Sequence, residues 1–157
     1  MMKQWMGVLA CAVAGMAVPA TGGAPDPRPK VPGGNDVLVS VSHLRSDKGT
    51  VIACLTADPQ RFPRCADDRQ AKRAQVAAGK ARAIVFHDVR PGTYAVALLH
   101  DENNNGKADR AMSMIPREGF GFSRDAKVHM GPPRFRDAAF AVPPGGAHMT
   151  ITMRYML

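Results

Sequence analysis

The sequence predicts an all-β protein, a single antiparallel β-sandwich. Short segments in which apolar and polar residues alternate recur along its 157 residues, and turn residues separate them. No segment places apolar residues at helical spacing over three turns, and no alternation of strands with helices points to a parallel sheet. A chain of this length can bury one core without help from a metal or a disulfide.

The N-terminus has the features of a secretory signal peptide. Lys3 precedes an apolar run over residues 5–18, and the residues that follow favour cleavage after Ala20. The run is too short for a membrane span, which needs roughly 20 residues. Lipid attachment at Cys11 is the alternative, but the apolar segment before this cysteine is short. We therefore expect a periplasmic or secreted protein with no transmembrane span in its mature chain.

Composition divides the rest of the chain into a linker and one domain. Residues 21–34 hold four prolines and four glycines, which predicts a linker, and the folded domain is expected over residues 35–157. The formal net charge of +8 suits contact with an anionic cell envelope. Nucleic acid is not expected, because no basic run is interleaved with aromatic residues. The expected partner is an envelope protein or a glycan.

Five segments have the alternation or the β-branched composition of strands. They are residues 37–41, 50–56, 83–87, 93–99 and 149–155. A hairpin turn is expected at residues 45–49, between the first two strands. Residues 57–81 have no clear pattern, and their polar part, residues 67–73, is expected to be a loop or a helical turn. Residues 100–140 are expected to form one long loop, and such loops are usually functional or specially tied down.

The two cysteines of the expected domain, Cys54 and Cys65, are predicted to form a disulfide. Export brings the chain into an oxidising compartment, where such pairs are oxidised. Closing this short loop would stabilise the fold by about 3 kcal/mol. A redox pair or a metal site is the alternative, and it is disfavoured because no histidine stands near either cysteine in the sequence.

Residues 101–109, with the sequence DENNNGKAD, have the spacing of a calcium-binding loop. Alternate residues of a tight loop can aim carboxylate, amide and backbone oxygens at one point, and Gly106 allows the sharp reversal. An EF-hand is disfavoured because its twelfth position requires a glutamate and is Met112 here. The loop resembles instead the calcium loops in the propeller blades of integrin α subunits, which join β-strands and have an acid at the ninth position.

The predicted cofactor is one structural calcium ion held by oxygen ligands. The predicted ligands are Asp101, Asn103, Asn105, Lys107 through its carbonyl, Asp109 and, from the following turn, Glu118. The alternative is a turn rich in asparagine and glycine whose side chains only cap their own backbone.

Two other functions would use overlapping residues. A periplasmic hydrolase would use His100, Asp101 and Glu118, with His87 or His43, as acid, base or metal groups. No nucleophile motif, zinc signature or phosphate-binding loop accompanies these residues, so catalysis is disfavoured. His100 is expected instead to anchor the loop through a hydrogen bond.

A copper-binding protein would use thioether and imidazole ligands. The candidates are Met112, Met114, His129 and Met130. Methionine is more often an apolar filler, so this function is also disfavoured. Three aromatic residues near these candidates, Phe120, Phe122 and Phe135, are expected to pack in the core.

Four segments, taken in order, resemble a family of exported bacterial proteins of unknown function. They are FHDVRPGTYAV at residues 86–96, HDENNNGKAD at 100–109, PREGFGFS at 116–123 and GPPRFRDAAF at 131–140. The first resembles the turn and strand common in transthyretin-like and carboxypeptidase-regulatory β-sandwiches. The resemblance covers residues 36–155 and implies a transthyretin-like or immunoglobulin-like sandwich outside the cytoplasm, with no established activity. The hydrolases of 5-hydroxyisourate that share this fold end in Tyr-Arg-Gly-Ser, which this chain lacks.

Overall fold

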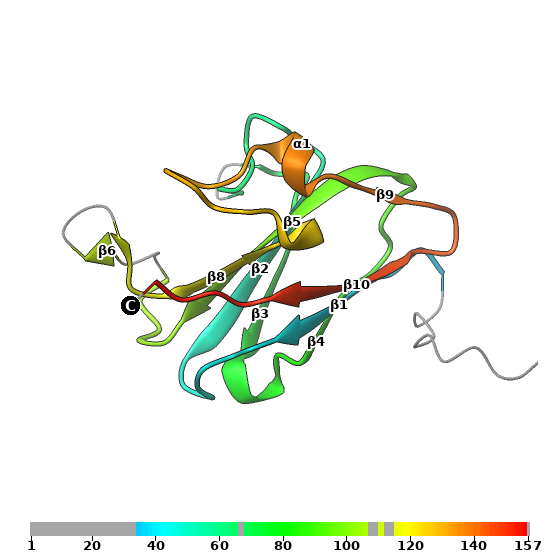
Figure 1. The fold of residues 1–157 in the computed structure, drawn as a ribbon. Helices are drawn as coiled ribbons and strands as arrows, with labels where there is room; N and C mark the ends of the chain where they lie inside the picture. Colours follow the sequence, from blue (N-terminus) through cyan, green and yellow to red (C-terminus); the bar gives the residue numbers. More distant parts are fainter. Residues whose placement is uncertain (1–33, 66–67, 107–109, 112–114, 157) are drawn as a thin grey trace, which may run out of the picture.

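The computed structural model describes residues 34–65, 68–106, 110–111 and 115–156. In this part of the chain, two main sheets face each other and a small two-stranded hairpin lies beside them (Figure 1). The described helical segments are short: η1 (Ala78–Lys80), η2 (Ser123–Asp125) and α1 (Phe135–Ala138). The prediction of an all-β sandwich is confirmed. Among the described residues, no helix is long and apolar enough to cross a membrane.

The first sheet has the strand order β10-β1-β4. Its strands are β1 (Val37–Ser42), β4 (Ala83–Phe86) and β10 (Ala147–Thr152). β4 pairs antiparallel with β1, whereas β10 runs parallel to β1. The sandwich therefore contains one parallel pair, which alternation within a strand cannot reveal. The short connection over residues 143–146 leads the chain from β9 (Phe140–Val142) of the second sheet into β10, which starts beside the beginning of β1.

The second sheet has the order β3-β2-β5-β8, and its neighbouring strands are antiparallel. Its strands are β2 (Thr50–Thr56), β3 (Lys72–Ala77), β5 (Gly92–Asp101) and β8 (Gly119–Phe122). A further strand, β9 (Phe140–Val142), pairs with the beginning of β5. The hairpin consists of β6 (Arg110–Ala111) and β7 (Ile115–Pro116). β5 is thus central, and it ends at the predicted calcium loop.

Both faces of β5 are covered. Val96 and Leu98 belong to the main core between the sheets, as their alternation predicts. Ala95, on the opposite face, belongs to a second cluster, where small side chains leave room for aromatic rings. The rings of that cluster are Phe62, Phe120, Phe122 and Phe135. The expectation of core packing is confirmed for Phe122, which is buried, while Phe120 and Phe135 are partly buried and pack against this cluster.

Three expectations about the connections are wrong. Residues 45–49 do not form a hairpin turn, because β1 and β2 belong to different sheets and the chain crosses from one sheet to the other there. β3 lies inside the region that had no clear pattern, and its charged residues suit an exposed edge strand. The expected long loop contains β8, whose glycines hide its alternation.

The predicted disulfide between Cys54 and Cys65 is confirmed, with 6.3 Å between the Cα atoms. It fastens the loop after β2 to the strand itself. The same loop is held by the Thr56 hydroxyl, which donates to the Asp68 carboxylate at 2.6 Å, and by the Arg73 guanidinium, which donates to the Cys65 carbonyl.

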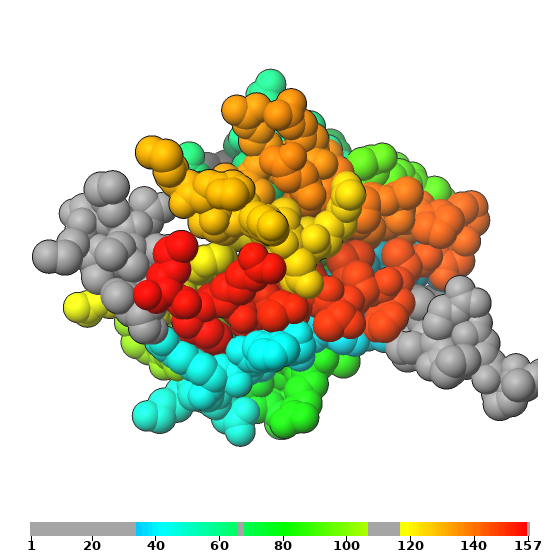
Figure 2. All heavy atoms as spheres, in the orientation of Figure 1, coloured from blue at the N-terminus to red at the C-terminus, as the bar shows by residue number. Residues whose placement is uncertain are grey.

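The end of the chain lies along the surface between the two sheets. Figure 2 shows the red C-terminal segment between the cyan residues of β1 and the yellow residues around η2. Phe120 and Arg154 exchange two backbone hydrogen bonds of 3.0 and 2.8 Å, so the segment after β10 covers the outer edge of β8. This position carries Tyr155 to the end of β5.

Candidate functional site

Asp101 closes a tight turn at the end of β5. Its side chain is fully buried, and its two carboxylate oxygens accept the N–H groups of Asn105 at 3.1 Å and Gly106 at 2.7 Å. The Asn103 side-chain oxygen also accepts the Asn105 N–H, at 3.1 Å. Positive φ angles at Asn104 (58°) and Gly106 (71°) turn the chain sharply. These bonds build an Asx-type turn and also the first half of the predicted calcium loop.

The second half of the predicted ligand set is described only in part. Lys107 and Asp109 lie outside the described residues. Glu118 is described and is only 5% exposed. Across β5 and β8, Gly119, the residue after Glu118, pairs with His100, the residue before Asp101. Two predicted ligands that are far apart in sequence therefore adjoin one paired position of the sheet.

In the part of the chain that the structure describes, no group of three or more histidine, cysteine, aspartate or glutamate side chains could hold a metal ion. Asp101 and Glu118 supply two carboxylates, and Asn103 and Asn105 would have to supply amide or backbone oxygens. A complete oxygen site would thus depend on the two predicted ligands at residues 107 and 109.

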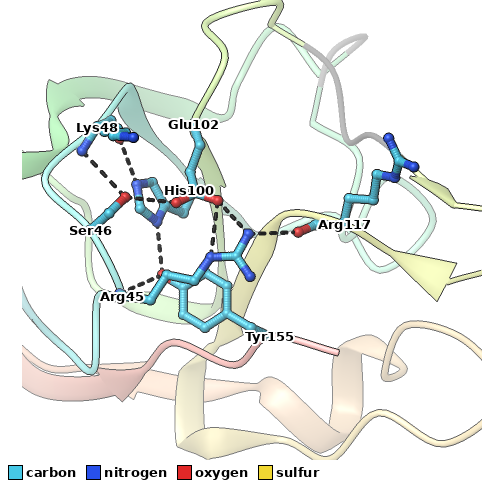
Figure 3. A network of polar contacts seen from close by, with 7 residues as sticks. All are labelled: Arg45, Ser46, Lys48, His100, Glu102, Arg117 and Tyr155. Atoms are coloured by element: carbon cyan, nitrogen blue, oxygen red, sulfur yellow. Dashed lines mark hydrogen bonds and ion pairs between the residues drawn. The ribbon is translucent and has the colours of Figure 1, made fainter. Parts of the chain in front are cut away.

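A polar network lies beside the turn, centred on Arg45 and Glu102 (Figure 3). The Arg45 guanidinium donates to the Glu102 carboxylate through Nε at 3.0 Å and through a second nitrogen. It also donates to the Arg117 carbonyl at 3.0 Å. The Ser46 hydroxyl donates to the second Glu102 oxygen at 2.6 Å. One guanidinium therefore joins the residue after Asp101 to the residue before Glu118.

His100 is fully buried next to this network, and both ring nitrogens are engaged. Nε2 lies 2.8 Å from the Lys48 carbonyl, which can only accept, so Nε2 carries the proton of a neutral ring. Nδ1 then accepts from the Tyr155 hydroxyl at 2.7 Å. The Tyr155 oxygen in turn accepts the Arg45 backbone N–H at 3.2 Å. His100 forms anchoring bonds, as expected, but to the β1–β2 connection and the end of the chain.

Charge and burial alter the acid–base properties of this network. The hydrogen bond from Arg45 is the main reason why the pKa of the Glu102 carboxyl falls from 4.5 to about 2. The same bond raises the pKa of Arg45. Burial raises the pKa of the Tyr155 hydroxyl, whose ring lies under the Arg45 guanidinium at 4.5 Å. Glu102 is therefore ionised across the physiological range.

The other candidate groups lie apart from His100. His87 pairs with the Asp36 carboxylate at 2.9 Å, and His43 is exposed at the end of β1. Of the candidate copper ligands, His129 and Met130 are exposed, with Met130 in full contact with solvent. The candidate copper ligands Met112 and Met114 lie outside the described residues.

Sequence reasoning missed Arg45, Ser46 and Tyr155 as members of this site. Their partners lie more than 50 residues away in the chain, so no local spacing predicts the contacts. One feature of the sequence is related to the Tyr155 contact. Residue 119 is a glycine, and the Tyr155 ring occupies the space that a side chain at this position would fill. A Cβ atom at residue 119 would lie 2.6 Å from the ring carbon that bears the hydroxyl.

These features define a class of protein: a small β-sandwich domain with a disulfide and an oxygen-rich turn beside a polar network that includes the buried His100. The chain belongs to a bacterial family, described as uncharacterized protein conserved in bacteria (DUF2141), whose model matches residues 39–152. The resemblance to an uncharacterized bacterial family is confirmed at this level, while the transthyretin-like relationship stays a prediction. No curated protein and no solved structure gives a significant match.

Proposed function

We propose that this protein is an exported, non-catalytic β-sandwich protein whose loop at residues 101–109 binds one structural calcium ion. With the loop fixed by the ion, the domain would serve as a structural or binding module of the cell envelope. The observation that carries the proposal is the burial of two carboxylates, Asp101 and Glu118, which adjoin the paired residues His100 and Gly119.

Carboxylates that are ionised and buried close to each other repel, and a bound cation would offset that cost. Asp101 can contribute to such a site in spite of its two backbone hydrogen bonds. An ionised carboxylate has about four lone-pair directions, so two N–H donors leave acceptor capacity for an ion. The turn thus holds Asp101 in a fixed orientation without using all of its oxygen lone pairs.

The ligand chemistry favours calcium over the other metals considered. Carboxylate, amide and backbone oxygens in a flexible loop suit calcium, which takes six to eight oxygens. Magnesium demands near-octahedral geometry and keeps several waters, and copper prefers sulfur and nitrogen ligands. The proposal therefore names calcium as the ion, with Asp101, Asn103, Asn105, the Lys107 carbonyl, Asp109 and Glu118 as its ligands.

A hydrolase that uses His100 is a weaker proposal. Both ring nitrogens already form hydrogen bonds within the protein, and the side chain is fully buried. A general base needs a nitrogen within reach of the substrate proton. Export agrees with the disulfide, because such bonds persist in oxidising compartments. The proposed partner remains an envelope protein or a glycan.

Thermal unfolding after chelation, and then with calcium, magnesium or copper added, tests the proposal. Binding to the folded state alone should raise the melting temperature with calcium, since calcium at 100 times its Kd would stabilise by about 2.7 kcal/mol. Asp109→Asn should remove this rise, whereas the control Asp137→Asn on α1 should keep it. No calcium response in the wild type, or an equal response in Asp109→Asn, would refute the site. A response to copper alone would favour the methionine and histidine ligands instead.

A further inference from the structure

A pocket of about 350 Å³ lies between the β1–β2 connection and the segment around η1. Its apolar lining comes from Val41, Leu44 and Ala78. Its chargeable lining comes from His43, Asp47 and Arg82. The volume lies near the lower end of the roughly 300–1,000 Å³ typical of small-molecule sites, so an occupant would be small.

Two side chains of opposite charge line this pocket without a polar partner among the described residues. Asp47 and Arg82 both line the pocket, yet neither side chain forms an ion pair or a hydrogen bond with any other residue that the structure describes. The His43 ring likewise has no polar partner among those residues. An anionic and a cationic group therefore both line this small pocket.

The wall that carries His43 and Asp47 is held in place from behind. In the β1–β2 connection, the Ser46 hydroxyl donates a hydrogen bond to Glu102 (Figure 3). The Lys48 carbonyl accepts one from the buried His100. These bonds flank Asp47 on both sides. His43 has a φ of 58°, a left-handed conformation that histidine adopts more readily than most residues with a side chain. The bonds of Ser46 and Lys48 hold the backbone on either side of Asp47, which lowers the cost of ordering this wall on binding.

We propose that this pocket binds a small zwitterion of the amino-acid type. Its carboxylate would pair with Arg82 and its ammonium group with Asp47, while a short apolar side chain would cover Val41, Leu44 and Ala78. Such a ligand has a group of opposite charge for each of these two side chains. The proposal goes beyond the calcium site and does not require a metal.

The test is an NMR titration of the protein, purified after expression of the full-length chain and kept in chelator so that calcium plays no part. L-Leucine is the probe, and 4-methylpentanoate and isopentylamine lack its ammonium and carboxylate groups respectively. We expect saturable shifts at the backbone amides of residues 41–44, 47 and 78–82 with leucine, and affinity at least about tenfold weaker for both analogues.

Variants assign the two charges to the two ligand groups. Arg82→Gln and Asp47→Asn should each weaken leucine binding about tenfold, because each removes one charged partner. Lys80→Gln removes the same charge as Arg82→Gln two residues away and does not line the pocket, so it should leave the affinity unchanged. The proposal is overturned by the absence of saturable shifts at millimolar leucine, by equal affinity for the analogues, or by equal losses in Lys80→Gln and Arg82→Gln.

Discussion

The Tyr155 hydroxyl donates a hydrogen bond of 2.7 Å to Nδ1 of the buried His100, and this bond joins the end of the chain to the end of the central strand. Because Nε2 of the same ring bonds to the Lys48 carbonyl, His100 also fixes the β1–β2 connection. The proposed calcium loop therefore begins at a point where three separate segments of the chain meet. Hydrogen bonds within the protein hold this starting point.

Tyr155→Phe should destabilise the fold, because it leaves the buried Nδ1 of His100 without its donor. Loss of one partner of a buried hydrogen bond costs about 1–3 kcal/mol. Chemical denaturation measures the difference, and Tyr94→Phe is the matched control because the Tyr94 hydroxyl forms no hydrogen bond within the described residues. Equal losses in the two variants would mean that the His100 bond contributes nothing specific.

The ion pair between Arg45 and Glu102 should make stability depend on pH in the acid range. The pKa of Glu102 is about 2 in the folded protein and 4.5 without the interaction, so its contribution is full above pH 4.5 and is lost as the pH falls toward 2. Both side chains are partly exposed, at 38% and 23%, so screening limits the contribution to about 1 kcal/mol.

The comparison that tests this pH dependence is wild type against Glu102→Gln, unfolded by denaturant at several pH values. The wild type should be more stable by about 1 kcal/mol at pH 7, and the two free energies of unfolding should converge below pH 4.5. Added salt should reduce the difference at pH 7, since a partly exposed pair is screened. A difference that stays constant down to pH 2 would contradict this account of the pair.

Gly119→Ala should destabilise the protein by displacing the Tyr155 ring, because the new methyl group would lie 2.6 Å from its Cζ atom. Overpacking of this kind typically costs about 1–3 kcal/mol. Gly131→Ala is the control, since a Cβ at residue 131 meets nothing within 4 Å. Loss of the Tyr155 contact should appear as a change in tyrosine fluorescence or in the NMR shifts of His100, and unchanged signals would argue against it.

Removal of the disulfide should lower the free energy of unfolding by about 3 kcal/mol, because the bond between Cys54 and Cys65 closes a short loop of the unfolded chain. The double variant Cys54→Ser, Cys65→Ser and the reduced wild type should show the same loss by chemical denaturation. Reductant should have no further effect on the double variant. A reduced protein as stable as the oxidised one would show that the bond does not contribute.

The strands that bury one clear face could be predicted from the sequence. Val37, Val39 and Val41 lie on one face of β1, where two half-exposed serines follow Leu38 on the other face, and β5 shows its core face through Val96 and Leu98. The elements that were missed lack this contrast. β3 has charged and small residues at a sheet edge, and β8 alternates phenylalanine with glycine, so neither has the composition of a half-buried strand.

The site could be predicted only where its residues are close in sequence. The turn from Asp101 to Gly106 follows from local spacing, because its hydrogen bonds join residues two to five apart. The network of Arg45 with Glu102, and of Tyr155 with His100, depends on how two sheets stack and where the last strand ends. Apart from Gly119, which leaves space for the Tyr155 ring, the local pattern of the sequence does not indicate these contacts.

The most direct test of the proposed function is a calorimetric titration of the chelated protein with calcium. We predict that one calcium ion binds per chain, that Asp109→Asn and Glu118→Gln abolish or strongly weaken binding, and that Asp137→Asn does not change it. Both acidic variants should remain folded in chelator, as judged by their circular dichroism. A wild-type protein that takes up no calcium, or one whose uptake survives in both acidic variants, would contradict the account and leave residues 101–109 as a turn that only caps its own backbone.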